Sequence, residues 1–220
     1  MSDYAKKLRR HLRNIGSEGI GSRYKVDLNS IGINEKSEFN CYSNLRSFDR
    51  GHVTTGHIIA IKKGGVAECW ICLSPACDMV PRDANFLPEN RDLLPFVAVK
   101  LNGVSLENAM SRATENHFVF LPKNPKVIGS GVDAYSINKG GESNSKPIWQ
   151  RMYLANKGFF DENKTIKIGE TCFSGEGNCF QWYDSEVLFQ LRAEYALNLL
   201  QRFGNNASRA GLGINFQNHG

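Results

Sequence analysis

Two strand-like runs joined by a short glycine turn limit the folds open to this chain more than any other feature. The first run is VTTGHIIAI (53–61), the second is VAECWICL (66–73), and KKGG stands between them. Apolar and β-branched residues bounded by a Gly-Gly pair are typical of a β-hairpin. The sequence therefore predicts an antiparallel sheet at the centre of the fold.

Several later segments extend this β pattern. PFVAVKL (95–101), HFVFLP (117–122), PIWQRMYLA (147–155) and TIKIGETCF (165–173) are strand-like in composition, and Asn102-Gly103 after the first of them indicates a turn. In SLENAMSRATEN (105–116) the apolar residues after Ser105 have helical spacing, and Ser105 is a good N-cap residue. SNLRSFDRG (43–51) is compatible with a short helix. Residues 122–147, rich in Gly, Ser, Asn and Lys, are expected to form a mobile excursion.

Helical periodicity is strongest near the two ends of the chain. Residues 3–15 carry an apolar stripe beside a basic face, and Gly16 follows them. A second helix is predicted for 185–203, capped by Asp184 or Ser185 and ended by Gly204. The expected fold is α+β: a curved antiparallel sheet or small SH3-like β-barrel with an N-terminal basic helix and a long C-terminal helix. We expect a helical segment, 1–51, and a barrel-like domain, 52–220, in one compact unit.

Charge and apolar content limit the possible partners. The formal net charge is +5, and most of it lies in the first fifteen residues, which makes nucleic acid a possible partner of that segment. The alternative is a docked helix with a solvated basic face. No apolar run approaches the roughly 20 residues that span a bilayer, and no secretory signal is present, so a cytoplasmic location without membrane contact is expected. The basic residues are Lys6, Lys7, Arg9, Arg10 and Arg13.

The six cysteines raise the questions of redox state and metal binding. Without an export signal they are expected to be reduced thiols. Cys69 and Cys72 have the spacing of half a zinc site, which Cys77 or the distant Cys172 and Cys179 could complete. A strand, however, projects residues three apart to opposite faces, and buried cysteine is common. The sequence therefore favours core cysteines and no metal.

The stretch CDMVPRD (77–83) follows directly after a predicted strand end. Cys77 at that corner is a candidate nucleophile if His57 or His117, both in strand-like runs, activates it. The alternative is that Asp78 caps the turn while Cys77 packs beneath it. Acidic and basic residues alternate from 78 to 92, which suits a loop of ion pairs better than a cation site. No G-x-G-x-x-G or Walker pattern is present, so no cofactor is predicted.

Two resemblances bear on these residues. TTGHIIAI and ECWICLSPACDMVP, within residues 52–80, resemble the opening strands of the SH3-like barrels of MazF/PemK-type toxin ribonucleases. The resemblance implies a small barrel and RNA cleavage. The arginine that this family carries before its apolar return strand is absent here, where Glu68 and Cys69 stand, and His57 replaces the aspartate of the family's Gly-Asp pair. That arginine stabilises the charged transition state, so the departure argues against the usual cleavage.

SPACDMVP together with LRAEYALNLLQRFGNNASRAGLGINF resembles the C-terminal region of bacterial response-receiver-like proteins of conflict and anti-phage defence operons. This resemblance implies a regulatory or sensing component of a bacterial immune assembly, with a protein partner of a defence complex or an upstream domain.

Three functions follow from these observations. The first is a non-enzymatic regulatory or interaction module of a bacterial defence or stress-response system, with the basic helix and the 78–92 loop as contact surfaces. The second is a toxin-like nuclease or nucleic-acid-binding protein on an SH3-like barrel, using His57, Ser74, Asp78 and Arg82, with RNA or DNA contacted through the basic helix. The third is a cysteine-dependent hydrolase centred on Cys77.

Overall fold

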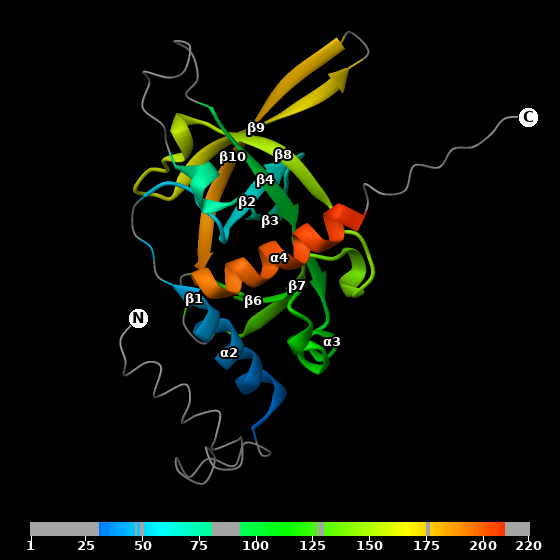
Figure 1. The fold of residues 1–220 in the computed structure, drawn as a ribbon. Coiled ribbons are helices and arrows are strands. Elements are labelled where there is room, and N and C mark those ends of the chain that lie inside the picture. Colours follow the sequence, from blue (N-terminus) through cyan, green and yellow to red (C-terminus); the bar gives the residue numbers. More distant parts are fainter. Residues whose placement is uncertain are drawn as a thin grey trace, which may run out of the picture. The chain divides into compact units, whose positions relative to one another are not determined.

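The computed structural model describes residues 31–46, 48, 51–80, 93–125, 127, 130–174 and 177–209. The chain divides into two units, Met1–Lys36 and Ser37–Gly220, and the fold below is that of the second unit (Figure 1). The helix predicted for 3–15 lies outside the described residues.

Six antiparallel strands close into a barrel in the order β10-β2-β3-β4-β8-β9, and β9 pairs again with β10. Closure pairs both edges of each strand and so leaves no open sheet edge in the ring. The short strand β1 (Leu45–Arg46) extends the sheet from β10. The expected α+β fold with a small barrel is therefore confirmed. The barrel strands are β2 (His57–Lys63), β3 (Val66–Cys72), β4 (Leu94–Lys100), β8 (Trp149–Leu154), β9 (Thr165–Ser174) and β10 (Gly177–Leu191).

The barrel interior is filled by every second residue of its strands. Ile59, Trp70, Phe96, Met152 and Ile168 are buried members of one cluster to which all six strands contribute. Alternation along each strand sends the intervening side chains to the outer face. The interior of the barrel is thus a packed core, with the buried His57 at the start of β2 and Lys63 at its other end.

A second sheet and one helix cover part of the barrel's outer face, and two further helices pack on the other face of that sheet. The second sheet has the order β5-β7-β6, from β5 (Asn102–Val104), β7 (Val132–Ser136) and β6 (Phe118–Pro122). One of its faces packs with α4 (Ala193–Arg209) against the outer residues of β2, β3 and β4. Its other face packs against Cys41 of α2 (Ile33–Asn44) and Ala109 of α3 (Leu106–Ser111). No helix of the described part of the chain is long and apolar enough to cross a bilayer.

Two local predictions are confirmed. β2 and β3 form a hairpin joined by Gly64 and Gly65, whose φ angles of +57° and +84° suit the two-residue turns that match strand twist. Ser105 is the N-cap of α3, where its hydroxyl accepts a hydrogen bond of 3.2 Å from the backbone N–H of Asn108.

Four expectations about local structure were wrong. The C-terminal helix begins at residue 193 rather than 185, because residues 185–191 continue β10 and pair with β1 and β2. The helix expected at 43–51 is absent from its described residues, where α2 ends at Asn44 and β1 follows. Asn102-Gly103 begins β5 instead of forming a turn. Within 122–147, residues 132–136 form the central strand of the second sheet, so this part is no excursion.

Candidate functional site

Three aromatic side chains lie in a row on the outer face of β8, β9 and β10. Phe180 and Trp182 on β10 are 40% and 42% exposed. The ring centroid of Phe180 lies 5.1 Å from that of Trp182 and 5.6 Å from that of Tyr153 on β8. Large exposed aromatic rings in contact with one another are uncommon on a protein surface and mark candidate binding sites.

Strand register explains why these rings meet. Gly169 of β9 pairs with Trp182 on one side and with Tyr153 on the other. Phe180 leans across this glycine, and a Cβ atom at position 169 would overlap its ring. The missing side chain of Gly169 therefore creates the shallow seat in which Phe180 lies between its two aromatic neighbours.

Two exposed cations flank the rings. Arg151 lies two residues before Tyr153 on β8, and Lys167 lies two residues before Gly169 on β9, so both share the outer face with the aromatic row. Asp184 lies opposite Lys167 in the register, on the same outer face. We name the group of Arg151, Tyr153, Lys167, Phe180 and Trp182 the aromatic platform.

Two of the five platform residues, Phe180 and Trp182, stand on a stretch of β10 that has β9 as its only strand neighbour among the described residues. β8 pairs with β9 only at Leu154–Ile168 and Tyr153–Gly169, and β2 pairs with β10 only from Ser185 onward. Residues 170–174 pair with 177–181 and, among the described residues, neither segment pairs with a third strand, while residues 182–184 pair only with 167–169 of β9. We call residues 170–184 the ribbon; its two strands extend beyond the barrel in Figure 1.

A disulfide between Cys172 and Cys179 crosses the ribbon. The two residues are directly opposite each other in the register of β9 and β10. The expectation that all six cysteines are reduced is therefore wrong for this pair, because strand register brings together two thiols that are seven residues apart. Both side chains are partly exposed.

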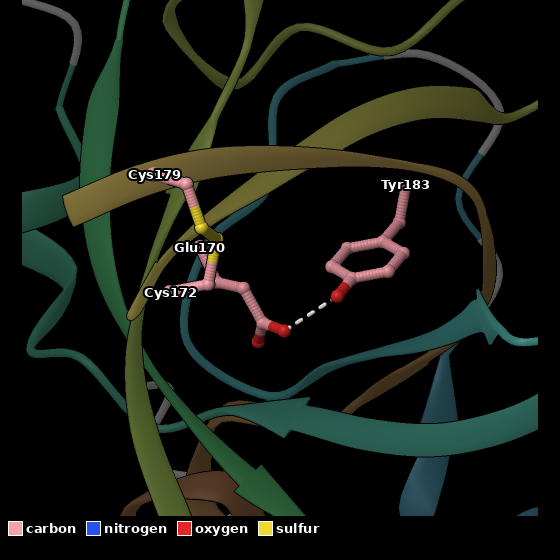
Figure 2. Close-up of a disulfide and its surroundings, with 4 residues drawn as sticks. All are labelled: Glu170, Cys172, Cys179 and Tyr183. Carbon is pink, nitrogen blue, oxygen red and sulfur yellow. Dashed lines mark hydrogen bonds between the residues drawn. A yellow bond between two sulfur atoms is a disulfide. The ribbon is translucent and has the colours of Figure 1, made fainter. Parts of the chain in front are cut away.

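The base of the ribbon is held to the barrel by a polar cluster at one end of the barrel. Lys63 Nζ lies 2.5 Å from Oε2 of Glu170, and the Tyr183 hydroxyl donates a hydrogen bond of 2.6 Å to Oε1 of the same carboxylate. The Lys63 ammonium also lies 5.2 Å from the ring centroid of Trp70 and 5.0 Å from that of Tyr183. Figure 2 shows Glu170 reaching Tyr183 beside the disulfide.

The contacts within this cluster shift the pKa values of two of its side chains. Burial and the hydrogen bond to Glu170 raise the pKa of Tyr183 to about 12, so its hydroxyl remains a donor at neutral pH. A hydrogen bond from Lys100 lowers the pKa of Glu68, whose other oxygen accepts from the Trp70 indole N–H at 3.2 Å. Each carboxylate thus has a lysine partner, and the cluster serves as a clasp between ribbon and barrel.

His57 does not have the surroundings of a general base. It is 3% exposed, and its Nδ1 accepts a hydrogen bond of 3.0 Å from the Thr54 backbone N–H. Its ring contacts Phe48 and Phe160 at centroid distances of 5.3 and 6.0 Å. Burial lowers the pKa of His57 to about 4. The imidazole is therefore a neutral part of the core.

Ser74, Cys77 and Asp78 lie at the corner after β3. The Ser74 hydroxyl is buried and accepts a hydrogen bond of 2.7 Å from the Val97 N–H, so it is already engaged. Cys77 is exposed on a 3₁₀ turn (Ala76–Met79) and its thiol lies 3.5 Å from a carboxylate oxygen of Asp78. The expectation that Cys77 packs beneath the turn is therefore wrong.

Ser74 and Asp78 line a pocket of 390 Å³ together with Arg151 and apolar residues of β4, while His57 is not among the lining residues. Arg82 lies outside the described residues, as do Lys6, Lys7, Arg9, Arg10 and Arg13. Among the described residues, no three His, Cys, Asp or Glu side chains are grouped as a metal site. Cys72 faces the barrel core while Cys69 packs against the outer cluster, as strand alternation predicts.

His117 directly precedes β6 of the second sheet, whereas His57 begins β2 of the barrel. Its Nε2 lies 3.1 Å from Oε2 of Glu115 and its Nδ1 lies 3.0 Å from the Ser136 hydroxyl. The order acid, histidine, serine matches that of a hydrolase triad. His117 and Ser136 are both fully buried, however, and the Ser136 hydroxyl also accepts from the Asn138 N–H at 3.0 Å. This hydrogen-bonded series supports the turns at 138–143. Because its histidine and serine are buried, it presents neither group to a substrate.

The sequence did not predict the platform, because its members come from three different strands. Phe180 and Trp182 are two residues apart, which is the spacing of one strand face, but that signal lies in a segment for which no strand was predicted. Their neighbours Tyr153 and Gly169 become visible only through pairing.

No protein-family model, curated protein or solved structure matches the chain.

Proposed function

We propose that the protein is a non-enzymatic binding module and that its barrel binds single-stranded nucleic acid on the aromatic platform. The observation that carries this proposal is the row of Tyr153, Phe180 and Trp182 between two exposed cations. Nucleic-acid bases stack on exposed aromatic rings whatever their sequence, and arginine or lysine beside them contacts the phosphates.

The aromatic platform itself carries two cations and no carboxylate. The outward residues around it on β8, β9 and β10 include one carboxylate, Asp184, which lies opposite Lys167 in the register. Besides Asp184, the outward residues are Trp149, Arg151, Tyr153, Lys167, Gly169, Thr171, Phe180 and Trp182. A surface of rings and cations suits phosphates and bases together.

A non-enzymatic role is supported by the contacts of the candidate catalytic groups. His57 is buried and hydrogen-bonded to Thr54, and the Ser74 hydroxyl is engaged by Val97. Neither side chain is presented to a substrate as a base or nucleophile would be. A role in bacterial defence, with a protein partner, stays a prediction from the resemblance described above.

The test is fluorescence anisotropy with labelled single-stranded RNA and DNA of about ten nucleotides, a length within the range of single-strand sites. Trp182→Ala and Phe180→Ala are each expected to weaken binding about tenfold, the loss of one stacked base. Arg151→Gln with Lys167→Gln should lower the slope of log affinity against log salt by about 0.7 for each charge. Phe39→Ala, on a 75% exposed side chain of α2, and Lys139→Gln are the matched controls.

Three results would contradict the proposal. Absence of binding at low salt would leave a protein partner as the occupant of the platform. Binding that survives the platform variants but is lost when Lys6, Lys7, Arg9, Arg10 and Arg13 are neutralised would place the contact in the basic segment. Cleavage of the labelled strand in the same assay, lost in Asp78→Ala, would make the protein a nuclease.

A further inference from the structure

We propose that the disulfide between Cys172 and Cys179 is a redox switch for the aromatic platform. This inference rests on the proposed function and adds its regulation: the oxidised ribbon presents the rings to single-stranded nucleic acid, and the reduced ribbon does not.

The first step is the weakness of the ribbon on its own. Among the described residues, 170–174 pair only with 177–181 and 182–184 pair only with 167–169 of β9, whereas β8 and residues 165–169 of β9 lie within the closed barrel. Two isolated strands are marginally stable in water, because neither has a second neighbour to share the cost of ordering. The ribbon therefore depends on additional links.

The second step is the position of those links. The clasp of Lys63, Glu170 and Tyr183 holds the base of the ribbon, and the disulfide crosses it further from the barrel. Alternation places Glu170, Cys172, Cys179 and Tyr183 on one face of the ribbon and Phe180 and Trp182 on the other. Phe180 follows Cys179 directly, so the disulfide fixes the strand position from which this ring projects.

The third step is the access of a reductant to the disulfide. Cys172 and Cys179 are partly exposed, in contrast to Cys41 and Cys72, which are buried. A dithiol reductant can attack one cysteine sulfur with its thiolate, and the other cysteine leaves as a thiolate and takes up a proton. The second thiol of the reductant then closes on the mixed disulfide. One protein disulfide is broken, one disulfide forms in the reductant, and two electrons and two protons end on the cysteines.

The fourth step connects reduction to affinity. Without the covalent link the outer part of the ribbon gains conformational freedom, and ordering it again on binding costs free energy. Phe180 and Trp182 then no longer form a fixed row with Tyr153. We expect reduction to weaken binding of a single-stranded oligonucleotide about tenfold, because part of the binding free energy is then used to order the ribbon.

The test uses the full chain, oxidised or treated with dithiothreitol, and the Cys172→Ser, Cys179→Ser double variant. Thiol titration of the unfolded oxidised protein should find the four free cysteines, Cys41, Cys69, Cys72 and Cys77. Amide hydrogen exchange should become about tenfold faster in residues 177–184 on reduction, with residues 58–61 of β2 unchanged. Anisotropy with single-stranded RNA should report the loss of affinity. In the double variant dithiothreitol should change neither readout.

The outcomes separate the two proposals. Six free thiols, or equal exchange in the ribbon before and after reduction, overturns the switch whatever the binding result. Faster exchange with unchanged affinity also overturns it. If the oxidised protein binds no oligonucleotide, the proposed function fails, and the exchange data alone then decide whether the disulfide orders the ribbon.

Discussion

The ring of Phe180 on β10 occupies the space that a side chain on Gly169 of β9 would need. The ring is held there between Tyr153 and Trp182, its neighbours on either side. One missing side chain on the central strand thus allows three rings from two other strands to form a continuous row.

Gly169→Ala is therefore expected to displace Phe180 and weaken oligonucleotide binding about fivefold to tenfold, since one stacking surface is lost. The measurement is anisotropy beside far-ultraviolet circular dichroism, which should remain that of the wild type. Gly103→Ala, at an exposed strand glycine of β5 with open space where a Cβ would stand, is the matched control and should bind normally. Wild-type affinity in Gly169→Ala would show that the position of Phe180 does not matter.

The ion pair of Lys63 and Glu170 is expected to stabilise the fold. Its side chains are 20% and 17% exposed, and the pair joins β2 to the base of the ribbon. Lys63→Met should lower the free energy of unfolding by about 2 kcal/mol, because Glu170 is left partly buried without its cation. A double-mutant cycle with Glu170→Met in urea unfolding should give a coupling of about 1 kcal/mol.

The pair of Lys123 and Asp133 provides the comparison for that cycle. Its atoms are 3.9 Å apart and its side chains are 58% and 50% exposed. A surface pair of this kind should show a coupling close to zero in the same experiment. Equal couplings for the two pairs would mean that the clasp is no more than a surface contact.

Stability should fall as the pH falls, because His57 is buried in its neutral form. Its pKa is about 4 in the folded protein and the ordinary pKa of histidine is 6.5, so the unfolded chain binds more protons between these two values. Stability is then constant above about pH 6.5 and decreases toward pH 4, by up to about 3 kcal/mol for this one group.

Urea unfolding at several pH values checks this dependence. His57→Gln, which keeps an acceptor for the Thr54 N–H, should remove most of the slope while His117, whose pKa burial also lowers, contributes the remainder. An unchanged slope in His57→Gln would mean that other groups cause it.

Cysteine alkylation should distinguish a surface thiol from a nucleophile. Cys77 is exposed, whereas burial raises the pKa of Cys41 and of Cys72 to about 12. Iodoacetamide at neutral pH should therefore modify Cys77 in the folded protein and reach Cys41 and Cys72 only on unfolding. Mass spectrometry of peptides identifies the sites.

The alkylated protein should bind single-stranded RNA as well as the untreated protein, because Cys77 is not part of the platform. Cys77→Ser is the control and should behave in the same way. A hydrolytic activity that both alkylation and Cys77→Ser abolish would support the cysteine-dependent hydrolase instead.

The sequence alone predicted the features that depend on a few neighbouring residues. The hairpin between 53 and 73 follows from two apolar runs and a Gly-Gly turn whose positive φ angles other residues avoid. The N-cap at Ser105 follows from one hydroxyl and the first turn of α3. The opposite faces of Cys69 and Cys72 follow from strand alternation.

Only the tertiary structure decided where β10 ends and which residues its register brings together. Residues 185–191 have helical spacing of apolar side chains, but pairing with β1 and β2, distant in the chain, keeps them extended. The same register places Cys172 opposite Cys179, and Gly169 between Tyr153 and Trp182. Local propensity depends on adjacent residues, whereas strand register depends on pairing between strands: the pairing of β9 with β10 places the two cysteines opposite each other, and the pairing of strands farther apart in sequence assembles the platform and the clasp.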